Sequence, residues 1–379
     1  MYRAYVMKKI LIVTSSLQFV RTFLIPHIEH WVRNGWIVDV ASHDDGVSIP
    51  HVNRLIDIPV KRAPIHASNI VAIKRLSQHL ASEKYDIINC HTPIGAMIAR
   101  CASHKARRNG TKLVYMAHGF HFYKGAPMLN WLVYYTAEKC MARYTDALIT
   151  INDEDCNNAR NLLPEIPHQY RLYGVGYNTK HIRACNDEEL QRLRQQYDLH
   201  EDDFVLLYIA RYVRHKNHRF LIKAFAEIKQ YIPNAKLLLL GEGECMHECH
   251  SLAHKLGVDK SVVFAGYQTD ISHYLHLAHV GVSVSLMEGL PIGVLEEMLV
   301  GLPVVASNIR GHRDLIMDGE NGLLFDSKDS ADFIAKIEYL YNNRDERYRL
   351  GMSAQANIAQ YSAETIVPQM MDIFEHELS

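Results

Sequence analysis

Two glutamates bracket a short loop that could hold the hydroxyl and phosphate groups of a ligand. Glu288 and Glu296 have seven residues between them, in a stretch that reads SLMEGLPIGVLEEMLVGLP. The residues before the loop predict a buried parallel strand, and apolar residues at helical spacing follow it. A helix start directs free N–H groups at phosphate, whereas carboxylates accept hydrogen bonds from sugar or ribose hydroxyls. The alternative is an ordinary strand–helix corner with two exposed acids.

Two cations follow another predicted strand. Phe204–Ala210 is a continuous apolar run, and Arg211 and Lys216 come after it with four residues between them. Fixed cations in a dry site stabilise a negatively charged group better than water does. The alternative is a solvated basic loop, which suits the intervening Arg214 better than it suits this pair.

A histidine follows a third predicted strand, Lys112–Ala117. His118 is placed beyond the carboxyl end of a parallel strand, where open α/β sheets bind ligands. The alternative for a single histidine is a hydrogen-bonded structural side chain. In contrast, the run Cys245–His250 is not expected to hold a metal, because its cysteine pair and its histidine pair face different sides of a helix.

These groups are positioned by a regular alternation of strands and helices. Apolar runs of strand length alternate with amphipathic helical patterns along the chain, which predicts α/β domains with doubly wound parallel sheets. The polar stretch Tyr177–Asp187 interrupts the alternation and is interpreted as a linker. It divides the 379 residues into two domains of ordinary size. The final amphipathic stretch, Ala363–Leu378, is expected to be a helix.

The spacing of the two glutamates, E-x7-E, resembles a motif of family 4 glycosyltransferases, which have the GT-B fold. The cation pair resembles the family's R-x4-K pattern, and His118-Gly119 resembles its HG pair. The resemblance covers most of the chain. It implies two Rossmann-like domains facing a central cleft: an acceptor domain of residues 1–180 with 363–379, and a donor domain of residues 187–360. The last helix would cross back to the first domain.

The resemblance also implies roles for the site residues. His118, Arg211, Lys216 and Glu288 would act on the donor sugar and its diphosphate, and Glu296 would bind the ribose. The remaining donor contacts would come from Ser15, Ser16, Gly241, Tyr267, Gly289, Leu290, Ile292 and Gly293.

The chain departs from the family pattern at two turns. Family members commonly have glycines where this chain has Ser15-Ser16, and often a glycine in place of Pro291. Ordinary helix capping is the alternative role for Ser16. Glu297, next to the second motif glutamate, is turned about 100° around the helix and is expected to face solvent.

Composition and charge indicate the cellular compartment and the kind of partner to expect. No apolar run is long enough to span a bilayer, the N-terminus lacks a signal-peptide pattern, and the seven scattered cysteines fit a reducing cytoplasm. The net charge of −1 conceals a balance of +9 in residues 1–180 and −10 in residues 181–379. The basic half suggests contact with an anionic membrane or a phosphate-bearing acceptor. No recognised nucleic-acid motif accompanies the charge.

The segment Phe120–Tyr144 combines aromatic and aliphatic residues with Lys124, Lys139 and Arg143. This combination is typical of an interfacial helix, although aromatic residues of a helix packed on the sheet would give the same pattern. The segment is similar to those of capsular and exopolysaccharide transferases in the family, which act on lipid-linked acceptors. We therefore expect this region to hold the protein to the inner face of the plasma membrane.

The expected activity is that of a retaining, metal-independent glycosyltransferase. It would move a sugar, as hexosyltransferases do, from a nucleotide-diphosphate donor, with UDP as the expected nucleotide, to a lipid-linked saccharide in surface polysaccharide synthesis. No cofactor beyond this co-substrate is expected. The alternatives are a GT-B sugar-nucleotide epimerase and a non-catalytic partner subunit that binds the nucleotide sugar.

Overall fold

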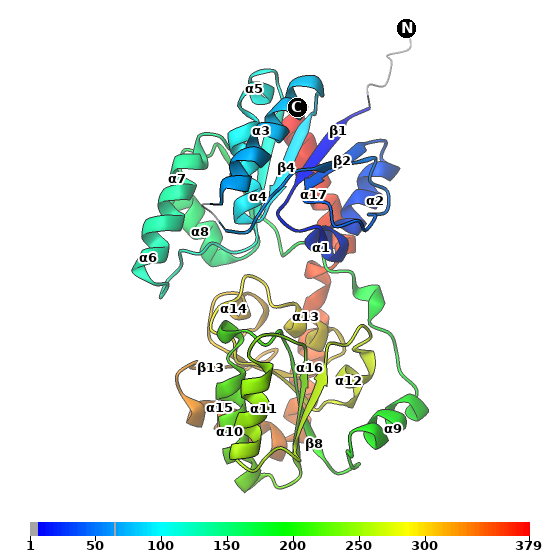
Figure 1. Cartoon of the computed structure of the whole chain (residues 1–379). Helices are drawn as coiled ribbons and strands as arrows, with labels where there is room; N and C mark the ends of the chain where they lie inside the picture. The colour runs from blue at the N-terminus through cyan, green and yellow to red at the C-terminus, as the bar shows by residue number, and fades with distance from the viewer. Residues whose placement is uncertain (1–6, 64–65) are drawn as a thin grey trace. The chain divides into compact units, whose positions relative to one another are not determined.

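The computed structural model describes residues 7–63 and 66–379 of the chain. Two compact units are formed, the first from residues 1–178 and 360–379 and the second from residues 179–359. Each unit has a parallel sheet whose strands alternate with helices along the chain, except that no helix lies between the strands that end at Ser42 and begin at Arg54 (Figure 1). The prediction of two α/β domains with doubly wound parallel sheets is confirmed.

The first unit has a seven-stranded sheet in the order β3-β2-β1-β4-β5-β6-β7. The order reverses between β1 and β4, which creates the crevice where such sheets bind ligands. The inner strands are buried along nearly their whole length, as expected of parallel strands covered on both faces. The strands are β1 (Lys9–Val13), β2 (Ile37–Ser42), β3 (Arg54–Asp57), β4 (Ile87–His91), β5 (Lys112–Ala117), β6 (Ala147–Thr150) and β7 (His168–Arg171).

Helices connect these strands, except β2 and β3, which are joined by residues 43–53 without a helix. Two of the helical stretches contain a π-helical turn, at Val20–Leu24 and at Trp131–Tyr135. The α-helices are α1 (Leu17–Phe19), α2 (Ile25–Arg33), α3 (Ala67–Ser82), α4 (Pro93–Ala102), α5 (His104–Arg108), α6 (Met128–Asn130), α7 (Thr136–Ala142) and α8 (Asp153–Leu162).

The last helix, α17 (Ala363–Leu378), belongs to the first unit. Its Phe374 packs against Trp31 of α2, with ring centroids 5.4 Å apart. The preceding residues are also attached to this unit, because the Tyr177 N–H donates to the carbonyl of Tyr361 at 2.8 Å. The chain therefore returns to the first unit, as expected.

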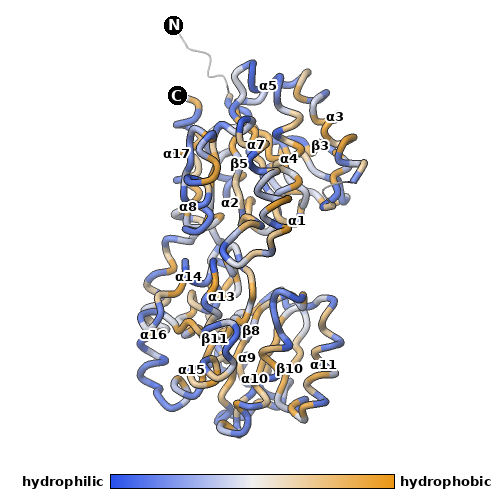
Figure 2. Tube along the Cα trace, turned by 90° about the vertical axis from the view of Figure 1, so that its left-hand side faces the viewer, coloured by the Kyte–Doolittle hydropathy of each residue, from blue (hydrophilic) through white to orange (hydrophobic). Residues whose placement is uncertain are grey.

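The second unit has a six-stranded sheet in the order β10-β9-β8-β11-β12-β13. Its order reverses between β8 and β11. Figure 2 shows apolar residues concentrated in strands such as β8, whereas the outer helix α16 is largely polar. The strands are β8 (Phe204–Ile209), β9 (Ala235–Leu240), β10 (Val262–Gly266), β11 (Val280–Ser283), β12 (Val304–Ser307) and β13 (Leu323–Phe325).

The helices of this unit follow the same alternation. They are α9 (Asp187–Gln196), α10 (His218–Tyr231), α11 (Met246–Lys255), α12 (Ser272–Leu277), α13 (Ile292–Leu299), α14 (His312–Leu315), α15 (Ser330–Asn342) and α16 (Arg344–Asn357), with short 3-10 turns at Thr179–His181, Arg214–Lys216 and Ile358–Tyr361.

The aromatic segment of the first unit divides into two kinds of side chain. Trp131 and Tyr135 pack against the core, as the packed-helix alternative predicts. Met128, Leu129 and Leu132 are instead 84%, 67% and 70% exposed. Among the helices of the described residues, none is both long and apolar enough to cross a bilayer.

Candidate active site

Backbone hydrogen bonds join the loops that follow β8, β9 and β10. The Gly241 N–H donates to Gly266 O at 2.8 Å, and the Tyr212 N–H donates to Glu242 O at 2.9 Å. Gly241 has a φ of +131°, and a Cβ there would collide with the carbonyl of Ala210. This close packing brings the predicted site residues Arg211, Gly241 and Tyr267 to the same edge of the sheet, where Arg211 and Tyr267 are exposed.

Lys216 and Glu288 form an ion pair between the cation loop and the first motif glutamate. Two hydrogen bonds fix the loops around it: the Leu286 N–H donates to His215 O at 2.7 Å, and the Tyr208 hydroxyl donates to Lys216 O at 2.7 Å. Sequence reasoning missed Tyr208, because a tyrosine within a buried strand has no distinguishing pattern. The structure thus joins two of the predicted site residues directly.

Glu288 is ionised in this pair. The side chain is only 9% exposed, and burial opposes its negative charge. The nearby ammonium of Lys216, with a smaller contribution from His312, nevertheless lowers the pKa of Glu288 below its ordinary value. The site therefore contains a fixed cation and a fixed anion in contact at neutral pH.

The helix α13 starts immediately beyond this ion pair. Pro291 precedes its first residue, Ile292, and a Cβ on Gly293 would lie 2.7 Å from Ile209 O. The first N–H groups of a helix have no intrahelical acceptor and favour an anion. A cavity of about 20 Å³, large enough for one water molecule, is lined by Lys216, Glu288 and Gly293. The predicted contacts Gly289 and Leu290 lie in the connecting loop and are partly exposed.

The two glutamates of α13 have different surroundings. Glu296 is 9% exposed, and its Oε1 lies 3.5 Å from Nε2 of His181. Glu297 is 1% exposed, so the prediction that it faces solvent is wrong. The side chain of Glu297, turned about 100° from that of Glu296 around the helix, points toward the sheet. A Cβ on Gly281 of β11 would lie 2.6 Å from the Glu297 carboxyl group.

Burial raises the pKa of Glu297 well above its ordinary value, and the negative charge of Glu296 adds to the shift. The folded protein therefore retains a proton that the unfolded chain releases above pH 4.5, and stability from this group falls as pH rises. We expect Glu297→Gln, which has no proton to lose, to raise the free energy of unfolding at pH 7–8 and to change it little below pH 4.5.

Urea denaturation between pH 4.5 and pH 8 measures this effect. Glu227→Gln, at an exposed glutamate of α10, is the control and should follow the unchanged protein at every pH. An unchanged pH dependence in Glu297→Gln would contradict the assignment of a protonated, buried carboxyl group.

The loop after β12 supports the glutamate loop from the other side. Gly311 has a φ of +84°, and a Cβ there would lie 2.9 Å from Gly289 O. The buried His312 lies 2.9 Å through Nε2 from the Ser283 hydroxyl. Sequence reasoning missed His312, although a histidine shortly after a strand was the signal used for His118.

In the first unit, His118 belongs to a chain of polar side chains at the ends of β4 and β5. Its Nε2 lies 3.0 Å from Nδ1 of His91, whose Nε2 lies 2.7 Å from Oδ1 of Asn89. The Asn89 amide group donates to Val114 O at 3.2 Å. Sequence reasoning missed both partners, although two polar residues at alternate positions of an apolar strand were visible.

The hydrogen bonds of this chain assign its tautomers. Burial lowers the pKa of His118 to about 3 and that of His91 well below its ordinary value, so both rings are neutral. Because the Asn89 oxygen can only accept, Nε2 of His91 donates, and Nδ1 of His91 accepts from Nε2–H of His118. This leaves Nδ1 of His118 unprotonated and able to accept a hydrogen bond from a hydroxyl group.

The two serines after β1 have internal partners. The Ser15 hydroxyl lies 2.8 Å from the hydroxyl of Thr92, and the Ser15 N–H donates to the same oxygen at 3.2 Å. The Ser16 hydroxyl accepts from the Phe19 N–H at 3.3 Å and caps the helix. The capping alternative for Ser16 is therefore confirmed, while its contact with a donor stays a prediction.

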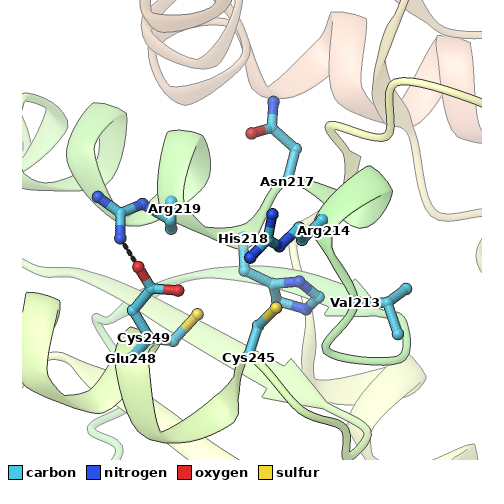
Figure 3. Close-up of a pocket in the computed structure, with 8 residues that line it drawn as sticks. All are labelled: Val213, Arg214, Asn217, His218, Arg219, Cys245, Glu248 and Cys249. Carbon is cyan, nitrogen blue, oxygen red and sulfur yellow. Dashed lines mark hydrogen bonds and ion pairs between the residues drawn. The ribbon is translucent and has the colours of Figure 1, made fainter.

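A separate pocket of about 240 Å³ contains none of the predicted site residues (Figure 3). The buried ring of His218 lines it and stacks on Tyr212, with centroids 4.1 Å apart. Cys245 and Cys249 also line the pocket, whereas His250 stacks on Phe264 at 3.7 Å.

Comparison with known families matches both units. Residues 190–357 match the family described as glycosyl transferases group 1, and residues 9–152 match the family described as glycosyl transferase 4-like. The two matches cover the parts of the chain that contain β1 to β6 and β8 to β13.

Individual proteins agree with these matches. EpsD of Bacillus subtilis (strain 168), whose name assigns it provisionally to the glycosyltransferases, is 40% identical over 97% of this chain and 96% of its own. The UDP-Gal:alpha-D-GlcNAc-diphosphoundecaprenol alpha-1,3-galactosyltransferase of Escherichia coli is 29% identical over 67% of this chain and 66% of its own.

A solved structure supports the fold. Anabaena Alr3699/HepE in complex with UDP and glucose aligns with a TM-score of 0.78 and 20% identity, over 97% of this chain and 100% of that one. The chain is a glycosyltransferase that belongs to family 4, and its two sheet-and-helix units are those of the GT-B fold.

Proposed function

We propose that the protein transfers a sugar, with retention of its anomeric configuration, from a UDP-sugar to a lipid-linked saccharide in surface polysaccharide synthesis. The observation that carries the proposal is the contact of Lys216 with Glu288 beside the start of α13. A cation, free N–H groups and a carboxylate in one place match the phosphates and hydroxyls of a nucleotide sugar.

The donor changes the partners of this ion pair. Its diphosphate takes Lys216 as a counter-ion, and Glu288 is then free to accept hydrogen bonds from sugar hydroxyls. The exposed Arg211 and the N–H groups at the start of α13 offset the remaining negative charge. These groups supply the electrostatic stabilisation for which other transferases use a metal ion, so we propose that none is required.

The transfer step is a same-face substitution at the anomeric carbon. The bond from this carbon to the acceptor oxygen forms as its bond to the β-phosphate oxygen of UDP breaks, and the proton of the acceptor hydroxyl passes to that phosphate oxygen. Nδ1 of His118 accepts a hydrogen bond from a hydroxyl of the donor sugar, Glu296 binds the ribose, and Tyr267 contacts the base. The name of the E. coli relative, with its UDP-Gal donor and diphosphoundecaprenol-linked acceptor, supports these substrate classes.

A panel of UDP-sugars, incubated with the protein with and without undecaprenyl-diphosphate saccharides, tests the proposal. UDP release that depends on the acceptor, with a product of the donor's anomeric configuration, is expected. Interconversion of the free donor without acceptor would indicate an epimerase, and binding without turnover would indicate a partner subunit. Activity that is lost with a chelator and restored by Mg²⁺ would contradict metal independence.

The exposed end of the aromatic segment is the proposed membrane contact. Met128, Leu129 and Leu132 are exposed together at α6 and the π-helical turn that follows it, and the exposed Lys124 and Lys139 flank them in the chain. Aliphatic side chains enter the acyl boundary while nearby lysines meet anionic headgroups. We propose that this end holds the protein on the cytoplasmic face of the membrane near its acceptor.

Charged substitutions on this end should abolish vesicle binding. Transfer of one leucine side chain out of water contributes about 1.5–3 kcal/mol, so Leu129→Glu/Leu132→Glu is expected to weaken binding to phosphatidylglycerol vesicles about a hundredfold or more. Flotation measures the bound fraction. Tyr231→Glu/Tyr348→Glu alters two exposed side chains of the second unit and serves as the control. If the two double variants floated with the vesicles to the same extent, the proposal that this end contacts the membrane would be contradicted.

A further inference from the structure

Three potential metal ligands meet where the last helix of the chain reaches an edge strand. His168 begins β7, and His376 and Glu377 lie at the end of α17. One ligand atom from each of the three lies within 4.8 Å of the others. The Nδ1 atom of His168 is 2.7 Å from Glu377 Oε1, and Nδ1 of His376 is 3.8 Å from the same oxygen. The sequence separates the strand from the helix by about 200 residues, so only the fold assembles this cluster.

The carboxylate at its centre is buried and incompletely neutralised. Glu377 is 3% exposed, and the Tyr170 hydroxyl donates to its Oε1 at 2.7 Å. Its Oε2 is buried without a hydrogen-bond partner in the described structure. No lysine or arginine of the described chain forms an ion pair with Glu377, whose ring neighbours are the two histidines. Oε1 thus has the Tyr170 hydroxyl and Nδ1 of His168 as neighbours, but Oε2 has neither a donor nor a cation among the described residues, which is costly for a buried carboxylate.

We propose that His168, His376 and Glu377 bind a divalent transition-metal ion of the zinc type. Imidazole nitrogens with one carboxylate oxygen suit Zn²⁺ and Co²⁺, whereas Mg²⁺ and Ca²⁺ prefer oxygen ligands throughout. Water would fill the fourth position, since both histidines are exposed. The Tyr170 hydroxyl lies 2.7 Å from Glu377 Oε1 and 2.8 Å from Nδ1 of His376, so metal binding would replace its contact with the histidine and leave the hydroxyl to orient the carboxylate.

A second cluster of three potential metal ligands differs from the proposed site because an arginine already occupies it. Cys185, Glu189 and His273 also approach one another in the second unit. There Arg183 already bonds the cluster, with Nη2 3.0 Å from Glu189 Oε1 and 3.0 Å from Nε2 of His273. The guanidinium supplies the positive charge and would repel a metal ion. The cluster at Glu377 has no such cation in the described structure.

The ion would fasten the last helix to the sheet of the first unit. The other end of α17 is already attached, through the hydrogen bond between the Ala363 N–H and the Tyr177 carbonyl at 2.9 Å. A metal at His376 and Glu377 would fix the C-terminal end of α17 to β7. Figure 1 marks this end of the helix with the letter C. This structural role does not depend on the proposed sugar transfer. A negative result for metal binding would therefore leave the proposal of donor binding unaffected, and the reverse also applies.

The test uses full-length protein without a histidine tag, stripped with a chelator and kept reduced with a phosphine. Zinc competition against a chromophoric chelator is expected to show one site per chain, and zinc is expected to raise the thermal unfolding temperature while Mg²⁺ does not. Co²⁺ should give the visible absorption of a tetrahedral site. His376→Gln is expected to weaken binding about tenfold or more and to remove the cobalt absorption.

Matched controls separate this site from weak binding by other histidines. His43 and His254 each face one carboxylate, Asp57 and Asp259, and neither belongs to a cluster of three potential ligands among the described residues. The double variant His43→Gln/His254→Gln should bind zinc like the unchanged protein. His376→Gln alters an exposed ring, so it should fold normally even if His168→Gln does not. Stoichiometric zinc binding that survives in His376→Gln, or no binding to the unchanged protein, would overturn the proposal.

Discussion

Lys216→Ala is expected to lower kcat/KM for sugar transfer by about a hundredfold to a thousandfold, the loss measured when one preorganised donor to a developing anion is removed. The ammonium contacts Glu288 in the absence of donor, and we propose that it meets the departing diphosphate during the reaction. Steady-state kinetics with a UDP-sugar and a lipid-linked acceptor measures the effect, and calorimetric titration with UDP measures the accompanying loss of affinity.

The same substitution should also destabilise the fold. Glu288 would become a buried carboxylate without its counter-ion, which costs about 3–5 kcal/mol in comparable cases. Lys216→Met/Glu288→Gln removes both charges and should recover most of the free energy of unfolding without recovering activity. If the activity of this double variant were close to that of the unchanged enzyme, the Lys216–Glu288 pair would be structural only. That result would contradict its proposed role in catalysis.

His118→Ala is expected to lower kcat about a hundredfold while leaving the affinity for UDP unchanged. The reason is that the residues proposed to hold the nucleotide belong to the second unit, whereas His118 lies at the end of β5 in the first. His91→Leu should cause a smaller loss, because it removes the acceptor that keeps the Nε2–H tautomer of His118 in place. Titration with UDP and single-turnover kinetics separate the two effects.

The dependence of the transfer rate on pH provides an independent check of the neutral state assigned to His118. Burial lowers the pKa of His118 to about 3, so the ring stays neutral through the range in which an ordinary histidine with a pKa of 6.5 would gain a proton. The transfer rate of the unchanged enzyme should therefore not fall with a midpoint near pH 6.5 as a result of His118 gaining a proton. A fall caused by His118 would be recognised because His91→Leu would shift its midpoint and His118→Ala would remove it. Such a loss, or reduced UDP affinity in His118→Ala, would contradict the neutral, sugar-facing assignment.

Local patterns were sufficient to predict the strands and several helices. β5 (Lys112–Ala117) and α17 (Ala363–Leu378) coincide with their predicted limits, because an apolar run of strand length and a helical apolar period each favour one backbone conformation. The juxtaposition of Lys216 with Glu288 could also be anticipated, because the carboxyl ends of β8 and β11 are neighbours in a doubly wound sheet.

The direction in which a helix packs was not predictable from its own residues. Glu297 was expected in solvent, but α13 presents that side to β11 and buries the carboxyl group. Leu129 and Leu132 show the reverse case, since apolar side chains of a helix next to the core remain exposed. A periodic pattern gives the angle between two side chains, whereas contact with the sheet decides which of them is buried.

The sequence by itself determined the family, the order of strands and helices and the identity of the motif residues, because each depends on residues close together in the chain. The tertiary structure alone decided that Asn89 and His91 set the tautomer of His118, and that His168 meets Glu377. Both arrangements depend on which strands and helices become neighbours and on the side each one presents. That choice is made by burial over the whole sheet, and no local pattern encodes it.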